Sequence, residues 1–339
     1  MNKSASFFTG GLLVGALLAT AGFSLYRRAQ LSSGAGGQGQ MVLKLGHSLD
    51  TGHPVHKAME FMKTRVEELS GGTMSINIYS SSVLGSETQC IEMLQNGTLA
   101  MTKTSAAAME NFIPSMTVFS LPYIFRDEAH YWQVLNGEVG NQLLQEGQSV
   151  YLYGLCYYDA GSRNFYTKDN PIRTPDDLKG LKIRVMPSQT AIAMIEAMGG
   201  SPTPIDWGEL YSALAQGTVD GAENNPPSFT SNKHYEVCKH FTLDGHTRIP
   251  DILMMSTRVW ERLGPQQQAW IQQAADESSE FQRRLWQEMT GEALEQAKEE
   301  GVTVYTVDTE AFAAKVAPML DRIENADVRE LLARIKEVE

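Results

Sequence analysis

The sequence predicts an α/β protein of two lobes that a long helix spans. Strand-like and helix-like segments alternate over 41–158, and the alternation returns over 161–244. An apolar stripe with near-helical spacing then covers 265–300. About 36 residues of helix would reach about 54 Å, which exceeds the diameter of one small domain. The stripe is too irregular for the strict heptads of a coiled coil, so a helix lying across two lobes is the better explanation.

The first α/β segment has recognisable strand and helix patterns. Residues 73–79 alternate as a strand does, whereas 54–69 place apolar residues on one helical face. Ser86 is a good N-cap for a helix that ends at Gly97. Strands are therefore expected at 41–47, 73–79, 99–105 and 150–158, and helices at 54–69, from Ser86 to Gly97, and across 127–145.

The second segment places two arginines near the starts of short strand-like runs, Arg163 and Arg184. Around Arg184 the apolar residues alternate with basic ones, so its guanidinium should lie on the face opposite the core. An arginine on a rigid strand can hold a carboxylate through two parallel hydrogen bonds. The alternative is an ordinary solvated surface arginine.

The other elements of this segment follow from caps and breakers. Thr174 caps a short turn at 175–178, which stops at Gly180. Further elements are helices at 187–198 and 208–216, a return strand at 252–257, and the long helix from Pro265, whose predicted apolar stripe is Trp270, Ala274, Phe281, Leu285, Met289, Ala293 and Ala297.

Residues 1–28 predict a secretory signal peptide or an uncleaved signal anchor. Lys3 precedes an uncharged run over 4–26, and Ala19-Thr20-Ala21 fits a small-x-small cleavage site. The run is also nearly long enough to span a bilayer, which leaves the anchor open. Residues 29–40 have the composition of a flexible tether.

The composition limits the class of partner. The 339 residues carry a formal net charge of −12, which argues against nucleic acid, because its backbone is bound by Lys and Arg. The acidity does not exclude an anionic small molecule, because a local arginine pair can dominate a small cleft. The odd cysteine count leaves at least one thiol unpaired, and apolar neighbours favour plain buried thiols at Cys90, Cys156 and Cys238.

Signatures of enzymes and cofactor sites are missing from the sequence. There is no Gly-x-x-x-x-Gly-Lys, no His-Glu-x-x-His and no Gly-x-Ser-x-Gly, so no cofactor is expected. His53 and His56 could share a metal, but two ligands and a loop histidine make a weak site, and an ordinary loop and helix N-terminus is the better explanation. His47, at the end of the first strand, is expected to face a cleft.

Two long blocks resemble a known family. The first runs from Gly161 to Val185. The second runs from Gly199 to Pro226 and includes the run Val-Asp-Gly-Ala-Glu-Asn at 219–224. Over nearly all of the chain after about residue 41, the sequence resembles the extracytoplasmic solute-binding subunits of tripartite ATP-independent periplasmic (TRAP) transporters.

That resemblance implies a two-lobed periplasmic binding protein fold with hinge strands near 159–161 and 245–251. Lobe I would comprise 41–160 and about 247–290, and lobe II would comprise 161–246 and about 291–339. The lobes would close over a solute, and the closed receptor would deliver it to a membrane permease driven by an ion gradient. The protein would then be periplasmic.

The resemblance also implies roles for individual residues. Arg184 matches the principal carboxylate-binding arginine, Arg163 a supporting arginine, and Asn224 a side chain that hydrogen-bonds the same carboxylate. Trp207 matches a position that often holds an aromatic residue, and simple core packing is its alternative. The weaker candidates are Glu87, Lys103, Asn225 and His47, and a surface strand position is the alternative for Lys103.

The runs 158–163 and 223–227 look like the sugar-acid branch of the family, and this resemblance implies a hexuronate such as glucuronate or galacturonate. The two arginines, with Lys103, would hold one acid group. Glu87, Asn225, His47 and Trp207 suit a polyhydroxylated body with an apolar ring face. A C4-dicarboxylate or 2-oxo acid receptor is the alternative within the family. An exported sugar-acid lyase, with Glu87 and a histidine as acid and base, is the alternative from another class.

Overall fold

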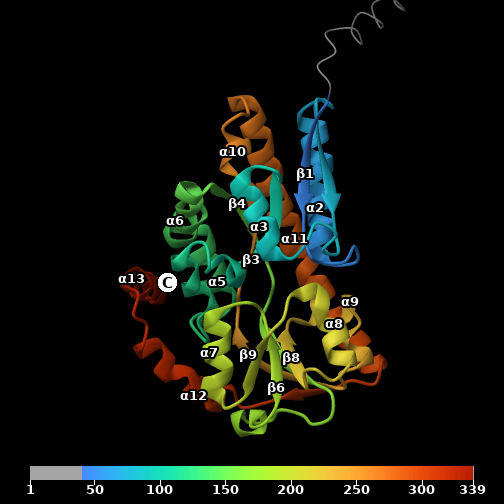
Figure 1. The fold of residues 1–339 in the computed structure, drawn as a ribbon, viewed down its shortest axis with the longest axis vertical. Helices are drawn as coiled ribbons and strands as arrows, with labels where there is room; N and C mark the ends of the chain where they lie inside the picture. Colours follow the sequence, from blue (N-terminus) through green and yellow to red (C-terminus); the bar gives the residue numbers. More distant parts are fainter. Residues whose placement is uncertain (1–39, 339) are drawn as a thin grey trace, which may run out of the picture. The chain divides into compact units, whose positions relative to one another are not determined.

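The computed structural model describes residues 40–338, which form two lobes, each built around its own mixed β-sheet (Figure 1). This confirms the predicted α/β class. The predicted signal segment 1–28 and nearly all of the tether 29–40 lie outside the described residues. From residue 40 to residue 338, no helix combines the length and the apolar character needed to cross a membrane.

The first lobe has a five-stranded sheet in the order β2-β1-β3-β10-β4. Its strands are β1 (Met41–Gly46), β2 (Met74–Tyr79), β3 (Met101–Ser105), β4 (Leu152–Tyr158) and β10 (Asp251–Ser256). Strands β1 and β3 run parallel, whereas β10 returns from the second lobe and runs antiparallel to both β3 and β4. Its helical segments are α2 (Pro54–Leu69), α3 (Glu87–Asn96), α4 (Ala106–Met109), η1 (Pro114–Ser120), α5 (Glu128–Asn136), α6 (Glu138–Glu146), η2 (Gly147–Val150) and α10 (Thr257–Trp260).

Local caps explain where the first helices begin and end. Helix α2 starts at Pro54, where the ring Nδ1 of His53 accepts a hydrogen bond from the backbone of Val55 at 3.2 Å. Helix α3 starts with a capping box and ends at Gly97, which has a φ of 78°. Both helices lie where the sequence predicted them.

The second lobe has a six-stranded sheet in the order β11-β9-β5-β8-β6-β7. Its strands are β5 (Arg163–Thr167), β6 (Lys182–Val185), β7 (Ser201–Pro204), β8 (Gly221–Asn224), β9 (His240–Thr247) and β11 (Thr303–Thr306). Its helical segments are η3 (Pro175–Leu178), α7 (Gln189–Met198), α8 (Trp207–Ala215), α9 (Pro226–Ser231), η4 (His234–Glu236) and α12 (Thr309–Asp321).

The helices of this lobe were easier to predict than its strands. The capped turn after Thr174 and helices α7 and α8 are confirmed. Strands β7, β8, β9 and β11 were not predicted. Strand β7 contains two prolines, which is tolerated because it is an edge strand. Strand β8 is Gly-Ala-Glu-Asn, a buried strand without the apolar alternation that identifies strands in a sequence.

The chain crosses between the lobes at 159–162 and at 248–250, which agrees with the predicted hinge positions. The long helix α11 (Pro265–Glu299) also spans both lobes. It packs on α2 and β4 in the first lobe and on α9 and β11 in the second (Figure 1). The predicted helix across two lobes is therefore confirmed.

The buried face of α11 is partly polar, which differs from the predicted apolar stripe. Ser278 and Gln282 are fully buried, whereas Phe281 is half-buried and stacks on Phe61 of α2. The side chain of Gln282 exchanges two hydrogen bonds with the backbone of Asp159, at 2.7 and 2.8 Å. Gln282 thereby satisfies the backbone of a crossing segment, which cannot pair within either sheet there, whereas Ser278 lies 2.8 Å from the hydroxyl of Tyr158.

A close approach explains one glycine in the same crossing segment. Gly161 has a φ of +56°, and a Cβ atom there would lie 2.9 Å from Nε1 of Trp286 in α11. Glycine therefore allows the crossing segment to pack directly against the long helix.

The last helix, α13 (Ala326–Glu337), lies beside α6 and η1 of the first lobe (Figure 1). Val328, Leu331, Leu332 and Ile335 join the hydrophobic core of that lobe. The sequence-based division instead placed about 291–339 in the second lobe. The apolar face of α13 is therefore buried against the first lobe.

The three cysteines are buried and unpaired, as predicted. Burial raises the pKa of each thiol, because it penalises the charged thiolate. They therefore act as small apolar side chains.

Candidate functional site

A cavity of about 390 Å³ lies between the lobes and is lined by residues of both. Seven of the eight residues that the sequence singled out line this cavity. Glu87 and Lys103 lie in the first lobe, and Arg163, Arg184, Trp207, Asn224 and Asn225 lie in the second. His47 is not among the lining residues.

Arg184 is buried at the cavity without a carboxylate partner among residues 40–338. It lies on β6, where Ile183 and Val185 pack into the core on the other face. Arg184 is 1% exposed, its Nε donates to the backbone oxygen of Ile205 at 2.8 Å, and its Nη1 has no hydrogen-bond partner within the described part of the chain. Burial lowers the pKa of this guanidinium, because desolvation penalises the charge. The predicted face is confirmed, but the side chain is not solvated.

Arg163, by contrast, is neutralised inside the second lobe. Its Nε and Nη2 donate to the carboxylate of Glu223 on β8, at 2.5 and 2.9 Å. Its Nη1 donates to Oδ1 of Asn224 at 3.0 Å. This fork on the neighbouring strand fixes the orientation of the guanidinium.

The network continues behind the cavity. His246 lies 3.3 Å from Glu223 and 2.8 Å from Asp244, and all three side chains are buried. Burial alone would lower the pKa of His246, but Asp244 and then Glu223 outweigh it and raise the pKa to about 9. Burial would raise the pKa of Glu223, but Arg163 and His246 hold it at about 2. The two cations and two carboxylates therefore compensate one another.

Lys103 is paired in the same way on the first-lobe side. On β3, its Nζ lies 3.0 Å from Glu87 and 3.1 Å from Asp251, and its side chain is 3% exposed. Burial would lower the pKa of Lys103, but Asp251 and Glu87 outweigh it and raise the pKa. Lys103 is thus neither a surface lysine nor a free cation, and this wall carries two carboxylates for one cation.

Trp207 and the two asparagines lie on the second-lobe side. Trp207 packs against the core of that lobe and also faces Arg184, whose guanidinium carbon lies 5.8 Å from the ring centre. Its Nε1 is buried, and no residue from 40 to 338 forms a hydrogen bond with it. Asn224 accepts from Arg163, and Asn225 caps α9 by accepting from the backbone of Ser228 at 2.8 Å.

His47 belongs to a histidine pair instead of the cavity. Its Nδ1 accepts from the backbone of Leu49 at 3.1 Å, which fixes the ring, and its Nε2 lies 2.9 Å from Nδ1 of His56. Burial, and then the charge of Lys103, lower the pKa of His47 to about 3. His53, also buried, bonds to Ser228 across the lobes at 3.1 Å. Within residues 40–338, no three His, Cys, Asp or Glu side chains gather as a metal site.

Sequence reasoning missed several acidic residues of this site. Asp206 and Asp251 line the cavity, and Glu223 holds Arg163 from behind. Asp251 lies in a predicted hinge segment, and Glu223 lies in the block that resembles the family. The sequence therefore drew attention to both segments, but it did not predict which side chains these two residues contact. His246 and Asp244 gave no signal, because their contacts depend on the sheet register.

The family of bacterial extracellular solute-binding proteins, family 7, matches residues 45–327 of this chain. A TRAP periplasmic solute-binding protein from Xanthobacter autotrophicus Py2, solved with bound β-D-galacturonate, has a TM-score of 0.85 and 35% identity, and the match covers 88% of this chain and 100% of that one. The corresponding protein from Pseudomonas putida F1, solved with D-glucuronate, has a TM-score of 0.85 and 35% identity, with 88% and 98% covered. One from Polaromonas sp. JS666, bound to D-erythronate, has a TM-score of 0.86 and 32% identity, with 88% and 99% covered.

Proposed function

This chain belongs to family 7 of the bacterial extracellular solute-binding proteins, the receptors of TRAP transporters, and from that premise we propose that its cavity binds a hexuronate such as glucuronate or galacturonate. It is a solute receptor and not an enzyme. The two alternatives left from the family are a C4-dicarboxylate and a 2-oxo acid.

The guanidinium of Arg184, which has no carboxylate partner among the described residues, carries the proposal. A buried charge without a partner is costly, and a solute carboxylate would remove that cost by accepting from Nη1. Arg163 is already neutralised by Glu223, so it contributes a fixed donor at most and little net charge. The cavity therefore favours one acid group, held mainly by Arg184.

The opposite wall favours hydroxyl groups over a second acid. Glu87 and Asp251 together outnumber the single cation Lys103, so a second carboxylate placed there would meet like charge. Hydroxyl groups could donate to these same oxygens. A hexuronate has one carboxylate and several hydroxyls, whereas a C4-dicarboxylate has two carboxylates.

Size and similarity support the same class of solute. A volume of about 390 Å³ is near the lower end of the range of about 300–1,000 Å³ for small-molecule sites. Trp207 offers an indole face for an apolar sugar face and an Nε1 donor for an oxygen. The similar proteins from Xanthobacter autotrophicus and Pseudomonas putida hold hexuronates, whereas the Polaromonas protein holds the shorter acid erythronate.

The partner and location follow from the family. The receptor would work in the periplasm after export through residues 1–28, and the closed, loaded form would dock on the TRAP permease. Mass spectrometry of the mature N-terminus distinguishes a cleaved signal peptide from a retained anchor.

The test is a thermal-shift screen of the purified protein against hexuronates, erythronate, C4-dicarboxylates, 2-oxo acids and neutral hexoses. A solute at 100 times its dissociation constant should add about 2.7 kcal/mol, which raises the melting temperature by several degrees. We expect a hexuronate to stabilise the protein, and Arg184→Ala to remove the effect while the exposed Arg322→Ala retains it. Stabilisation by dicarboxylates or 2-oxo acids alone would contradict the proposed solute.

A further inference from the structure

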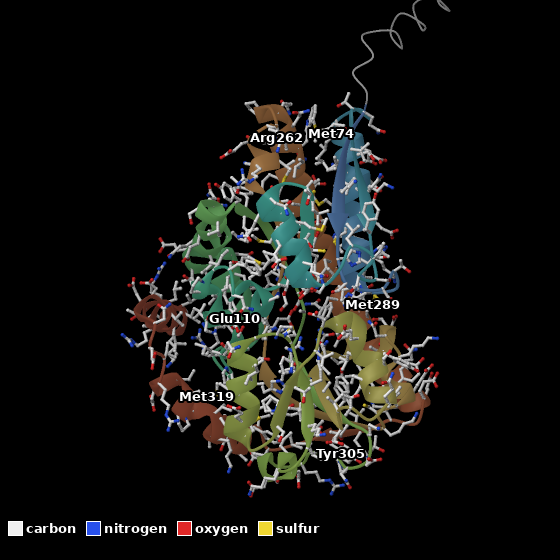
Figure 2. All side chains as sticks on the ribbon, viewed as in Figure 1. Met74, Glu110, Arg262, Met289, Tyr305 and Met319 are labelled. Carbon is white, nitrogen blue, oxygen red and sulfur yellow. The ribbon has the colours of Figure 1, made fainter. Side chains whose placement is uncertain are left out.

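One group of contacts between the lobes lies beside the cavity, at the start of α7. The carboxylate of Glu110, which follows α4 in the first lobe, accepts from the backbone nitrogen of Thr190 at 3.3 Å and from its hydroxyl at 3.0 Å. The neighbouring Asn111 donates to the backbone oxygen of Pro187 at 3.0 Å. Figure 2 shows Glu110 where the first lobe meets α7 of the second.

The position of Thr190 explains why a carboxylate fits there. Thr190 is the second residue of α7, a helix of ten residues, and its backbone N–H is among those without a partner inside the helix. Ser188 already caps the helix by accepting from Ala191 at 3.0 Å. Glu110 satisfies another N–H and adds negative charge at the positive end of the helix. The other lobe thus supplies part of the cap of α7.

This contact is adjacent to the cavity without lining it. Met186 and Pro187, which connect β6 to α7, line the cavity, and so does Ala108 of α4. Glu110 and Thr190 do not. The contact therefore joins the segment that follows Arg184 to the first lobe, at a position where it would not touch the solute.

We infer that Glu110 is a positioning residue that holds the lobes closed over bound solute, an inference that rests on the proposed receptor function. Glu110 is 8% exposed in this arrangement of the lobes, and moving α7 away from α4 would return both partners to water. A contact made in one state only shifts the equilibrium between states toward it. Loss of the contact should therefore speed the release of solute.

The experiment compares Glu110→Ala, Glu110→Gln and Thr190→Val with the wild type by stopped-flow fluorescence. The ligand is whichever acid most stabilises the wild type, so a failure of hexuronates alone leaves this test intact. We expect about tenfold faster dissociation in Glu110→Ala, with a nearly unchanged association rate, because one hydrogen-bonded charge is lost from the closed state. The ligand-free melting temperature should not change, which separates this role from a general effect on folding.

Two comparisons make the result specific. The side chain of Glu146 accepts from the hydroxyl of Ser115 within the first lobe, so Glu146→Gln is a matched carboxylate control that should leave dissociation unchanged. The effects of Glu110→Gln and Thr190→Val on dissociation should be less than additive in the double variant. An unchanged dissociation rate in Glu110→Ala, or an equal effect in Glu146→Gln, would overturn the inference.

Discussion

The two walls of the cavity each bury a cation, but they neutralise it differently. In the first lobe, Lys103 has two carboxylates within 3.1 Å, Glu87 and Asp251. In the second lobe, the Nε of Arg184 donates to a backbone oxygen. No carboxylate among the described residues pairs with its guanidinium. The difference indicates that the charge of Lys103 is structural, whereas the charge of Arg184 is left for a solute.

Arg163 sharpens this comparison within the second lobe. It lies on the strand next but one to Arg184, yet Glu223 and Asn224 already accept its hydrogen bonds, and His246 contacts the same Glu223 carboxylate. Residue type alone therefore does not identify the binding arginine, whereas the pairing of each guanidinium does.

The largest expected effect comes from breaking the compensated network. Glu223→Gln would leave Arg163 and the protonated His246 buried without their shared carboxylate. Removing one partner of a buried ion pair costs about 3–5 kcal/mol, so we expect a loss of that order in the free energy of unfolding. Urea denaturation measures it. A loss below about 1 kcal/mol would show that the network is not the structural part of this wall.

The next effect tests the unpaired cation. Arg184→Met keeps an unbranched apolar stem, shorter than that of arginine, and removes the charge that the solute would neutralise. We expect an affinity loss of at least about 100-fold, which corresponds to about 2.8 kcal/mol. The ligand-free protein should be no less stable, because an uncompensated buried charge disappears. Isothermal titration calorimetry measures the affinity, and differential scanning calorimetry measures the stability. Intact affinity with lowered stability would contradict the assignment of Arg184 as the cation that binds the solute.

A smaller effect appears in the pH dependence of stability. The folded pKa of His246 is raised to about 9 from 6.5, so its contribution is complete below pH 6.5 and is lost as the pH rises to about 9. His47 and His234 have folded pKa values lowered to about 3, so each reduces stability as the pH falls below 6.5. We expect maximal stability near pH 6.5–7.

The loss of stability above pH 7 should come from the second-lobe network of Arg163, Glu223, Asp244 and His246. We expect a decrease on the order of 1–3 kcal/mol between pH 7 and 9, since one pKa unit corresponds to about 1.4 kcal/mol. In His246→Gln the decrease should flatten, while His240→Gln, at a half-buried position outside the network, should retain it. Melting temperatures at constant ionic strength give the comparison. A wild-type curve that is flat from pH 7 to 9 would mean that His246 is neutral.

Local signals explain what the sequence could predict. Ser86 with Gly97, and Pro54 with the apolar face behind it, are short-range patterns that define a helix without its surroundings. The stripe over 265–300 likewise predicted the helix that spans both lobes, although its buried face includes the polar Ser278 and Gln282, and Gln282 bonds the crossing segment at Asp159.

The candidate site depended on longer-range contacts. The alternation around Arg184 indicated which face it occupies, but its burial depends on Trp207 and Ile205 more than twenty residues later. The pairing of Arg163 with Glu223 requires the antiparallel register of β5 and β8, which no local pattern encodes. His47 was predicted to face the cleft, and a turn that binds its ring to Leu49 directs it to His56 instead.

The smallest expected effect tests the first-lobe wall. Asp251→Asn keeps the shape of the side chain and removes one of the two carboxylates beside Lys103, so the wall becomes neutral overall. We expect dicarboxylate affinity to rise by up to about tenfold, or about 1.4 kcal/mol, and hexuronate affinity to fall by a few-fold as one strong hydroxyl acceptor weakens. Asp308→Asn, at the exposed N-cap of α12, is the control. Competition titrations measure the ratio of the two affinities. A constant ratio would mean that Lys103 and its partners stabilise the first lobe without discriminating between solutes. Selectivity would then depend on the second lobe alone.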